Sequence, residues 1–141
     1  MRDHEPPQEI AFEVPGWPPL KNEATSMLAI HHRQADRVRT LLVKAAEAAS
    51  AAGWISASAD VALEVIIRGP SARPPGDATN FLGGIADVLQ DKTNPRNIDL
   101  SHLGDLQAVA LYRDDRQISQ ISYHEEPAKS PSYLVRISNL S

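Results

Sequence analysis

Two acidic segments hold the residues whose types could do chemistry. Asp77 stands before a stretch with the apolar spacing of a helix, and Asp87 follows on that same stretch. Asp114 and Asp115 stand in a turn between two stretches with the alternation of strands. Carboxylates at a helix start and a strand end can converge on one hard cation, and Mg²⁺ uses one or two carboxylates and keeps several waters. The spacing therefore indicates a candidate Mg²⁺ site.

Each acidic segment also has a structural explanation. Asp is a favoured N-cap residue, so Asp77 could do no more than begin a helix. Asp is equally common in type I turns, which would account for Asp114 and Asp115. Taken singly, each segment is better explained by structure. Taken together, with Asp87 on the same helix, the two explanations are more evenly matched.

The chain lacks the sequence signatures of several common enzyme classes. It contains no phosphate-binding loop, no dinucleotide fingerprint and no H-E-x-x-H zinc helix. It also contains no cysteine, which excludes disulfides, zinc ribbons and thiol nucleophiles. His31 and His32 are adjacent and would point about 100° apart on a helix, so they make a poor metal pair. Gly83 and Gly84 fall inside a predicted helix, which indicates close approach of a backbone or a ligand, or a packing requirement.

Two helices and five strands are predicted to position these residues. Apolar residues at spacings of three and four predict helices over residues 25–52 and 77–89. Period-2 alternation or short apolar runs predict strands over residues 9–14, 61–68, 108–112, 117–124 and 133–137. The order β-α-β-α-β-β-β predicts one α/β (α+β) domain over residues 9–139, with a mixed sheet covered by two helices. Residues 1–8 are expected to form a loose tail, and residues 91–105 a long loop.

Composition limits the partners of this domain. The 141 residues are 42% hydrophobic and 23% charged, as in ordinary globular proteins, and no apolar run is long enough to cross a bilayer. No secretory signal is recognisable, so a cytoplasmic location is expected. The net charge of −4 means that binding to nucleic acid would need a local basic patch. Arg33, Arg37 and Lys44 recur at helical spacing and form either such a patch or a solvated face.

In three segments the sequence resembles the RusA-type Holliday junction resolvases. The family pattern has a W-P-P-x-x-N segment after a strand, a D-x-D-N-x-x-K helix running into D-A-L, and a D-D-x-Q-[IV] turn. Here these read Trp17-Pro18-Pro19-Leu20-Lys21-Asn22, then Asp77-Ala78-Thr79-Asn80 with Asp87-Val88-Leu89, then Asp114-Asp115-Arg116-Gln117-Ile118. The resemblance covers residues 10–137, nearly the whole chain, and the segments keep their order.

The resemblance implies a Mg²⁺-dependent endonuclease that cleaves branched DNA as a homodimer. It implies catalytic roles for Asp77, Asp115 and Asn80, with Asp87 and Asp114 as further metal ligands. Arg33, Arg37, Arg113 and Arg116 would contact phosphates of the four-way junction. A symmetric dimer would present two equivalent sites to that two-fold substrate.

Two positions depart from the family pattern. Thr79 stands where the family has its middle acid, and Gly83 stands where it has a lysine. Losing one anionic ligand and one cation should weaken both metal binding and charge stabilisation. The alternatives are therefore a RusA-like protein that binds DNA or a protein partner without cleavage, or a structural protein that uses the fold for something unrelated.

Overall fold

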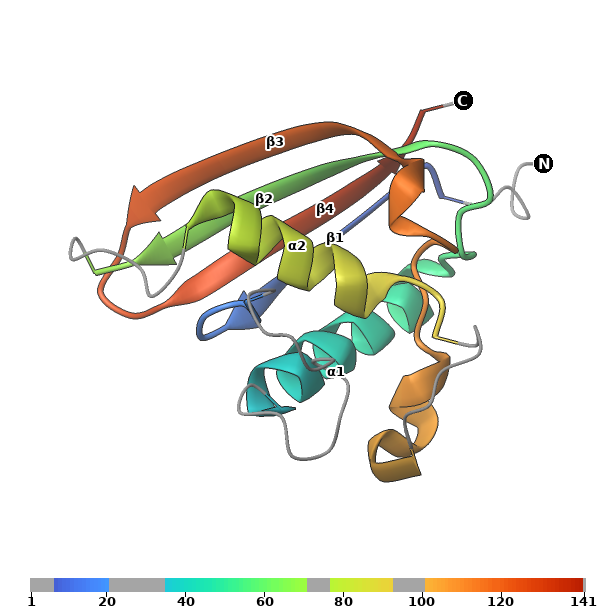
Figure 1. Ribbon diagram of the computed structural model, residues 1–141, viewed down its shortest axis with the longest axis horizontal. Helices are drawn as coiled ribbons and strands as arrows, with labels where there is room; N and C mark the ends of the chain where they lie inside the picture. The colour runs from blue at the N-terminus through green and yellow to red at the C-terminus, as the bar shows by residue number, and fades with distance from the viewer. Residues whose placement is uncertain (1–6, 21–34, 71–76, 93–100, 141) are drawn as a thin grey trace.

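The computed structural model describes residues 7–20, 35–70, 77–92 and 101–140. Its elements run in the order β1 (Glu9–Pro15), α1 (Ala35–Ala52), β2 (Val61–Gly69), α2 (Ala78–Leu89), η1 (Ser101–Ala108), η2 (Asp115–Gln117), β3 (Ile118–Pro127) and β4 (Ser132–Asn139) (Figure 1). The two η elements are 3-10 helices. The predicted α+β class, with a mixed sheet and two covering α-helices, is confirmed. No helix within the described ranges is long and apolar enough to cross a membrane.

The four strands form one mixed sheet in the order β1-β4-β2-β3. Strand β4 pairs antiparallel with both β1 and β2, whereas β2 and β3 are parallel. Because parallel strands need a crossover, the chain between β2 and β3 must pass over the sheet, and α2 and both 3-10 helices lie on this crossover. The crossover therefore carries all four acids that the sequence singled out.

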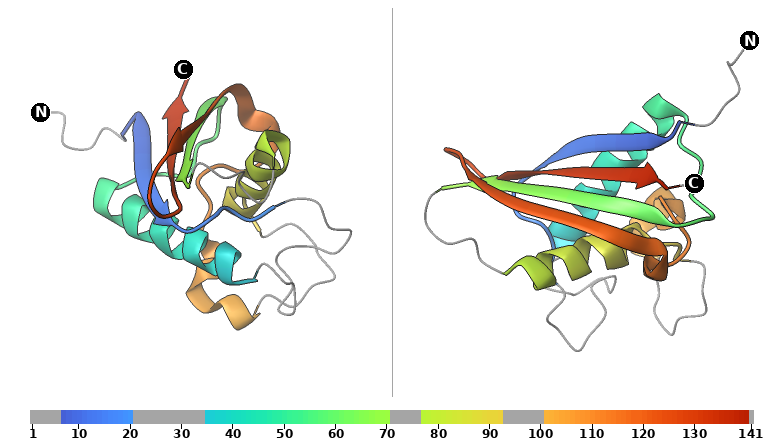
Figure 2. Two further views of the ribbon diagram at one scale, coloured as in Figure 1. Left: turned by 90° about the vertical axis from the view of Figure 1, so that its left-hand side faces the viewer. Right: turned by 90° about the horizontal axis from the view of Figure 1, so that it is seen from above.

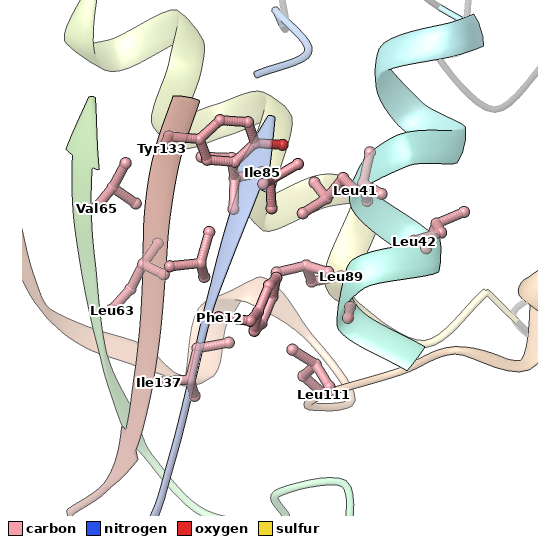
Figure 3. Close-up of a cluster of buried hydrophobic side chains, with 14 of the residues drawn as sticks. Phe12, Leu41, Leu42, Leu63, Val65, Ile85, Leu89, Leu111, Tyr133 and Ile137 are labelled. Atoms are coloured by element: carbon pink, nitrogen blue, oxygen red, sulfur yellow. The ribbon is translucent and has the colours of Figure 1, made fainter. Parts of the chain in front are cut away.

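The two α-helices cover one face of the sheet, and the other face is open (Figure 2). Buried and less buried residues alternate along β1, β2 and β4, as the period-2 pattern predicted. Figure 3 shows the buried strand residues, including Phe12, Leu63 and Ile137, pointing toward Leu41 and Leu42 of α1. Burial of this apolar surface is the main driving force for the fold.

The open face carries charged side chains that pair across the strands. Arg136 on β4 lies 3.0 Å from Glu9 on β1 and 2.9 Å from Glu64 on β2. Arg68 on β2 lies 2.7 Å from Glu13 on β1 and 3.1 Å from Glu126 on β3. The hydrogen bond to Glu126 is the largest cause of the raised pKa of Arg68. Arg136 on β4 thus joins β1 to β2, and Arg68 on β2 joins β1 to β3, on the face that the helices leave open.

The predicted strand over residues 108–112 is wrong. The 3-10 helix η1 runs through Ala108, and Tyr112 makes only isolated bridges to Ala57 and Gln90. Leu111 and Tyr112 are almost fully buried. A short apolar run is typical of any buried segment, and here it marks a connection that crosses beneath the end of α2.

Gly84 lets the Trp17-Pro18-Pro19 segment cross α2. A Cβ atom at Gly84 would lie 2.0 Å from the carbonyl oxygen of Pro19, so no larger residue fits without movement of the backbone. Beside this crossing, Trp17 stacks on Phe81 of α2, with ring centroids 6.4 Å apart. Of the two explanations for a glycine in this helix, the close approach of another backbone is the one found at Gly84.

Candidate functional site

Asp77 is the N-cap of α2. Its Oδ1 accepts a hydrogen bond from the backbone N–H of Asn80 (2.9 Å) and another from the Thr79 hydroxyl (3.0 Å). These two donors, the Asn80 amide first, lower the pKa of the Asp77 carboxyl. The Thr79 hydroxyl therefore contacts the Asp77 carboxylate directly. Asp77 contacts the backbone of Asn80, and one Asp77 oxygen is engaged in starting the helix.

The turn that precedes β3 is held together by two of its own side chains. Asp114 caps η2, and its Oδ1 accepts the backbone N–H of Arg116 (2.9 Å), which lowers the pKa of the Asp114 carboxyl. Gln117 Oε1 accepts the backbone N–H groups of Arg113 (2.8 Å) and Asp114 (2.9 Å). The structure therefore gives Asp114 the turn-capping role that was the alternative to metal binding.

Gln117 also fastens this turn to the rest of the domain. Its Nε2 donates to the carbonyl oxygens of Ala57 (3.0 Å) and Ala59 (2.8 Å), which lie just before β2. One side chain thus satisfies four backbone groups from two segments far apart in the sequence. The glutamine of the D-D-x-Q-I segment has a structural role that the sequence pattern alone did not reveal.

Asp115 and Asp87 lie on either side of Gln90, the C-cap residue of α2. Gln90 Nε2 donates to Asp87 Oδ1 (3.0 Å), and Gln90 Oε1 accepts the backbone N–H of Asp115 (3.1 Å). Beneath them is Tyr112, whose hydroxyl donates to the carbonyl of Ala86 (2.6 Å). Burial raises the pKa of Tyr112, and the negative charges of Asp115 and Asp87 raise it further. Gln90 thus joins the Asp87 carboxylate to the backbone of Asp115, and we call Asp87, Gln90 and Asp115 the carboxylate cluster.

Asp77 lies at the opposite end of α2 from the carboxylate cluster. The helix has 12 residues, which corresponds to about 18 Å of rise. Burial and the hydrogen bond to Glu125 raise the pKa of Tyr123 in the middle of β3, and the negative charge of Asp77 adds to this rise. Across the described ranges, no three His, Cys, Asp or Glu side chains are grouped so that they could hold a metal ion. The structure thus brings together Asp87 and Asp115 of the predicted metal ligands, and places Asp77 apart from them.

The predicted phosphate contacts are distributed over two parts of the fold. Arg113 and Arg116 are exposed beside the carboxylate cluster, and the Arg116 side chain is 91% accessible. Arg37 is half-buried on α1. Burial raises the pKa of Tyr133, and the positive charge of Arg37 offsets part of that rise. Arg33 lies outside the described residues. The structure therefore places two of the four arginines next to the two carboxylates.

Lys92 is a buried cation that the sequence reasoning missed. It is 4% exposed, and its ammonium donates to the carbonyl oxygens of Gln90 (3.1 Å) and Val109. Buried lysines are rare unless their charge is compensated, and carbonyl groups do this here. Lys92 joins the segment after α2 to the end of η1, and thereby supports the backbone of the carboxylate cluster.

The carboxylate cluster has the donor chemistry for one divalent cation. Mg²⁺ takes oxygen ligands and is commonly held by one or two carboxylates, with waters and substrate phosphates completing its shell. Asp87 and Asp115 are two such groups on two different elements, so their donor chemistry matches the ion that the resemblance implies. Asp77 does not fit the same ion, because it lies about one helix length away.

No protein-family model matches the chain, and no curated protein matches it significantly.

The hydrogen bonds to Asp77 predict a pH-dependent effect of its replacement. Because the folded-state pKa of Asp77 is lowered, its stabilisation is present above the unfolded-state pKa and is lost as the pH falls through the folded-state pKa. We expect Asp77→Ala to lower Tm at pH 7, and the difference from the wild type to shrink in acid. Asp77→Asn is the control, since asparagine also caps helices and does not titrate. Equal Tm values for Asp77→Ala and the wild type at pH 7 would show that the carboxylate does not stabilise α2.

Proposed function

We propose that this chain is a cytoplasmic, Mg²⁺-dependent endonuclease of the Holliday junction resolvase type, acting on branched DNA in recombination and repair. The observation that supports this proposal is the carboxylate cluster, in which Gln90 joins Asp87 to Asp115 beside Arg113 and Arg116. An acid at the end of α2, an acid in the turn and two exposed arginines of that turn have the chemistry to receive a cation and a phosphodiester. The protein would act as a symmetric homodimer, because a four-way junction has two-fold symmetry.

In this proposal each residue has a role that follows from its chemistry. Asp87 and Asp115 hold the cation, which supplies Lewis acidity and a more acidic bound water. Gln90 keeps the two acids in position through its hydrogen bonds to both of their residues. Arg113 and Arg116 contact phosphates through charge-assisted hydrogen bonds. Asp77 and Asn80 form the start of α2 and take no part in this proposed site. The proposed site lies at the other end of α2, where Asp87 and Asp115 are.

A second candidate function is binding of branched DNA without cleavage. Asp77 supports it, because the first acid of the family pattern is engaged in capping α2 and lies far from Asp115. Thr79 and Gly83 support it too, because they replace an acid and a lysine. The remaining arginines at the turn would then give binding alone.

One assay separates these two functions. The purified chain is incubated with a synthetic four-way junction in Mg²⁺ or in EDTA, and products and complexes are resolved on denaturing and native gels. The proposal predicts nicked product only in Mg²⁺. A retarded complex without product in Mg²⁺ would establish the second function and overturn the first. If the assay gives no product and no complex, that result contradicts both functions.

The arginines of the turn predict a change in the salt dependence of junction binding. Each phosphate contact contributes about −0.9 to the slope of log K against log salt on duplex DNA. We therefore expect Arg113→Ala combined with Arg116→Ala to make the slope shallower by about 2. Binding is measured by fluorescence anisotropy in EDTA, with Arg39→Ala as the control on an exposed position of α1. An unchanged slope in the double variant would remove both arginines from the DNA interface.

A further inference from the structure

Tyr133 carries a buried hydroxyl that has no hydrogen-bond partner. It is the second residue of β4 and lies fully buried on the face of the sheet that the helices cover. Among the described residues, its hydroxyl is the only buried side-chain polar atom without a partner. Figure 3 shows the ring beside Ile85 of α2, with the hydroxyl directed toward α1. An unpaired polar group in the core destabilises the fold, so this hydroxyl is expected to have a partner or a function.

Arg37 brings a positive charge to the same place from α1. It lies one helical turn before Leu41, so the two side chains project from the same face of the helix. Leu41 is on the side of α1 that faces Tyr133 (Figure 3). The charge of Arg37 offsets part of the rise that burial causes in the pKa of Tyr133, as expected for a guanidinium close to the hydroxyl. Within the described ranges, the Arg37 side chain makes no ion pair or hydrogen bond.

Tyr133 and Arg37 together offer hydrogen-bond donors and lack an acceptor. A guanidinium has five N–H donors and no acceptor, and the phenol O–H is a further donor. A partly buried charge without a counter-charge is unfavourable, and so is a buried hydroxyl without a hydrogen bond. A water molecule would correct only the second of these defects. An anion would correct both.

The number of donors favours a phosphate ion over a carboxylate. The planar fork of an arginine binds two oxygens of one oxyanion at the same time. A phosphate ion then has another oxygen for the phenol, whereas a carboxylate has only the two that the arginine binds. Because Tyr133 is fully buried, its hydroxyl is accessible to a small ion and not to the backbone of a polymer.

We propose that Tyr133 and Arg37 form a binding site for inorganic phosphate. This site is far from the carboxylate cluster, because Tyr133 pairs with Ile67 near the end of β2, whereas β3, which follows the turn with Asp115, begins opposite Val61 at the start of β2. Six residues of strand correspond to about 20 Å. The proposal therefore goes beyond the proposed function and does not depend on DNA cleavage.

Thermal unfolding of the full chain in phosphate, compared with sodium chloride at equal ionic strength, tests the site. Without phosphate, Tyr133→Phe should be at least as stable as the wild type, because it removes an unpaired buried hydroxyl. In roughly 20 mM phosphate the wild type should become the more stable of the two, since a ligand that binds the folded state raises Tm. Isothermal titration calorimetry should give a dissociation constant for phosphate at least about tenfold higher in Tyr133→Phe and in Arg37→Gln than in the wild type.

Two matched variants control for the general stabilisation of proteins by phosphate. The Tyr123 hydroxyl already donates to Glu125, and Arg39 is exposed on α1, so Tyr123→Phe and Arg39→Gln should respond to phosphate as the wild type does. The proposal is overturned if phosphate raises the Tm of Tyr133→Phe as much as that of the wild type, or if Arg37→Gln binds phosphate unchanged. A wild type that responds equally to phosphate and to sodium chloride would overturn it as well.

Discussion

Replacing Gly84 with alanine is expected to lower the free energy of unfolding by roughly 3 kcal/mol. The new Cβ would lie 2.0 Å from the carbonyl oxygen of Pro19 and 2.6 Å from its carbonyl carbon, and both atoms belong to the backbone. Alanine would favour the helix by about 1 kcal/mol at an exposed position, but the clash outweighs this gain. Either α2 or the Trp17-Pro18-Pro19 segment must move, which disturbs the stacking of Trp17 on Phe81.

Urea denaturation monitored by tryptophan fluorescence measures this effect. Ser50→Ala is the control, because Ser50 is an exposed position inside α1 and the change introduces the same residue. It should alter stability by no more than a few tenths of a kcal/mol. A Gly84→Ala variant as stable as the wild type would mean that Pro19 does not cross α2 at this position.

Replacing Asp115 with asparagine is expected to reduce Mg²⁺-dependent cleavage of a four-way junction by more than about 100-fold, since loss of a group that merely orients a metal ligand already costs 10–100-fold. The fold should be unaffected, because the backbone N–H of Asp115, and not its carboxylate, makes the hydrogen bond to Gln90. Asp87→Asn should have a comparable effect for the same chemical reason. The measurement is the single-turnover cleavage rate at saturating protein, with circular dichroism as the check on folding.

Asp114→Asn is the neighbouring control for this experiment. Asparagine can accept the Arg116 N–H as Asp114 does, so the turn should keep its conformation. Its cleavage rate is expected to stay within about threefold of the wild type. Undiminished cleavage by Asp115→Asn would remove this residue from the site, and equal losses in both variants would show that the turn acts only through its total charge.

The regular elements were predictable because their periodicity reflects burial. The alternation in β2 and β4 and the apolar spacing in α2 gave each element within a few residues. On α1 the buried residues recur at spacings of three and four, as in the pattern that predicted this helix: Val38, Leu41, Leu42 and Ala45. Asp77 was recognisable as a cap because its role depends on neighbours within three residues. Interactions between residues this close in the chain can be predicted from the sequence alone.

The crossover between β2 and β3 was not predictable in the same way. Leu111 and Tyr112 are buried by packing beneath α2, and no local periodicity distinguishes that packing from a strand. Sequence spacing also could not show that Asp115 lies beside Asp87 and not beside Asp77, because that depends on the direction in which α2 runs relative to β3. Gln90 and Lys92 were missed because their contacts join segments that meet only in the folded chain.

Mn²⁺-induced broadening of backbone amide signals in a two-dimensional NMR spectrum tests the carboxylate cluster most directly, since Mn²⁺ accepts the same oxygen ligands as Mg²⁺. Substoichiometric Mn²⁺ is added to the ¹⁵N-labelled wild type and to Asp115→Asn. The account predicts that the Asp87, Gln90 and Asp115 signals broaden first in the wild type, that the Asp77 and Asn80 signals change least, and that the selectivity is lost in the variant. Broadening centred on Asp77, or broadening without any preferred position, would contradict it.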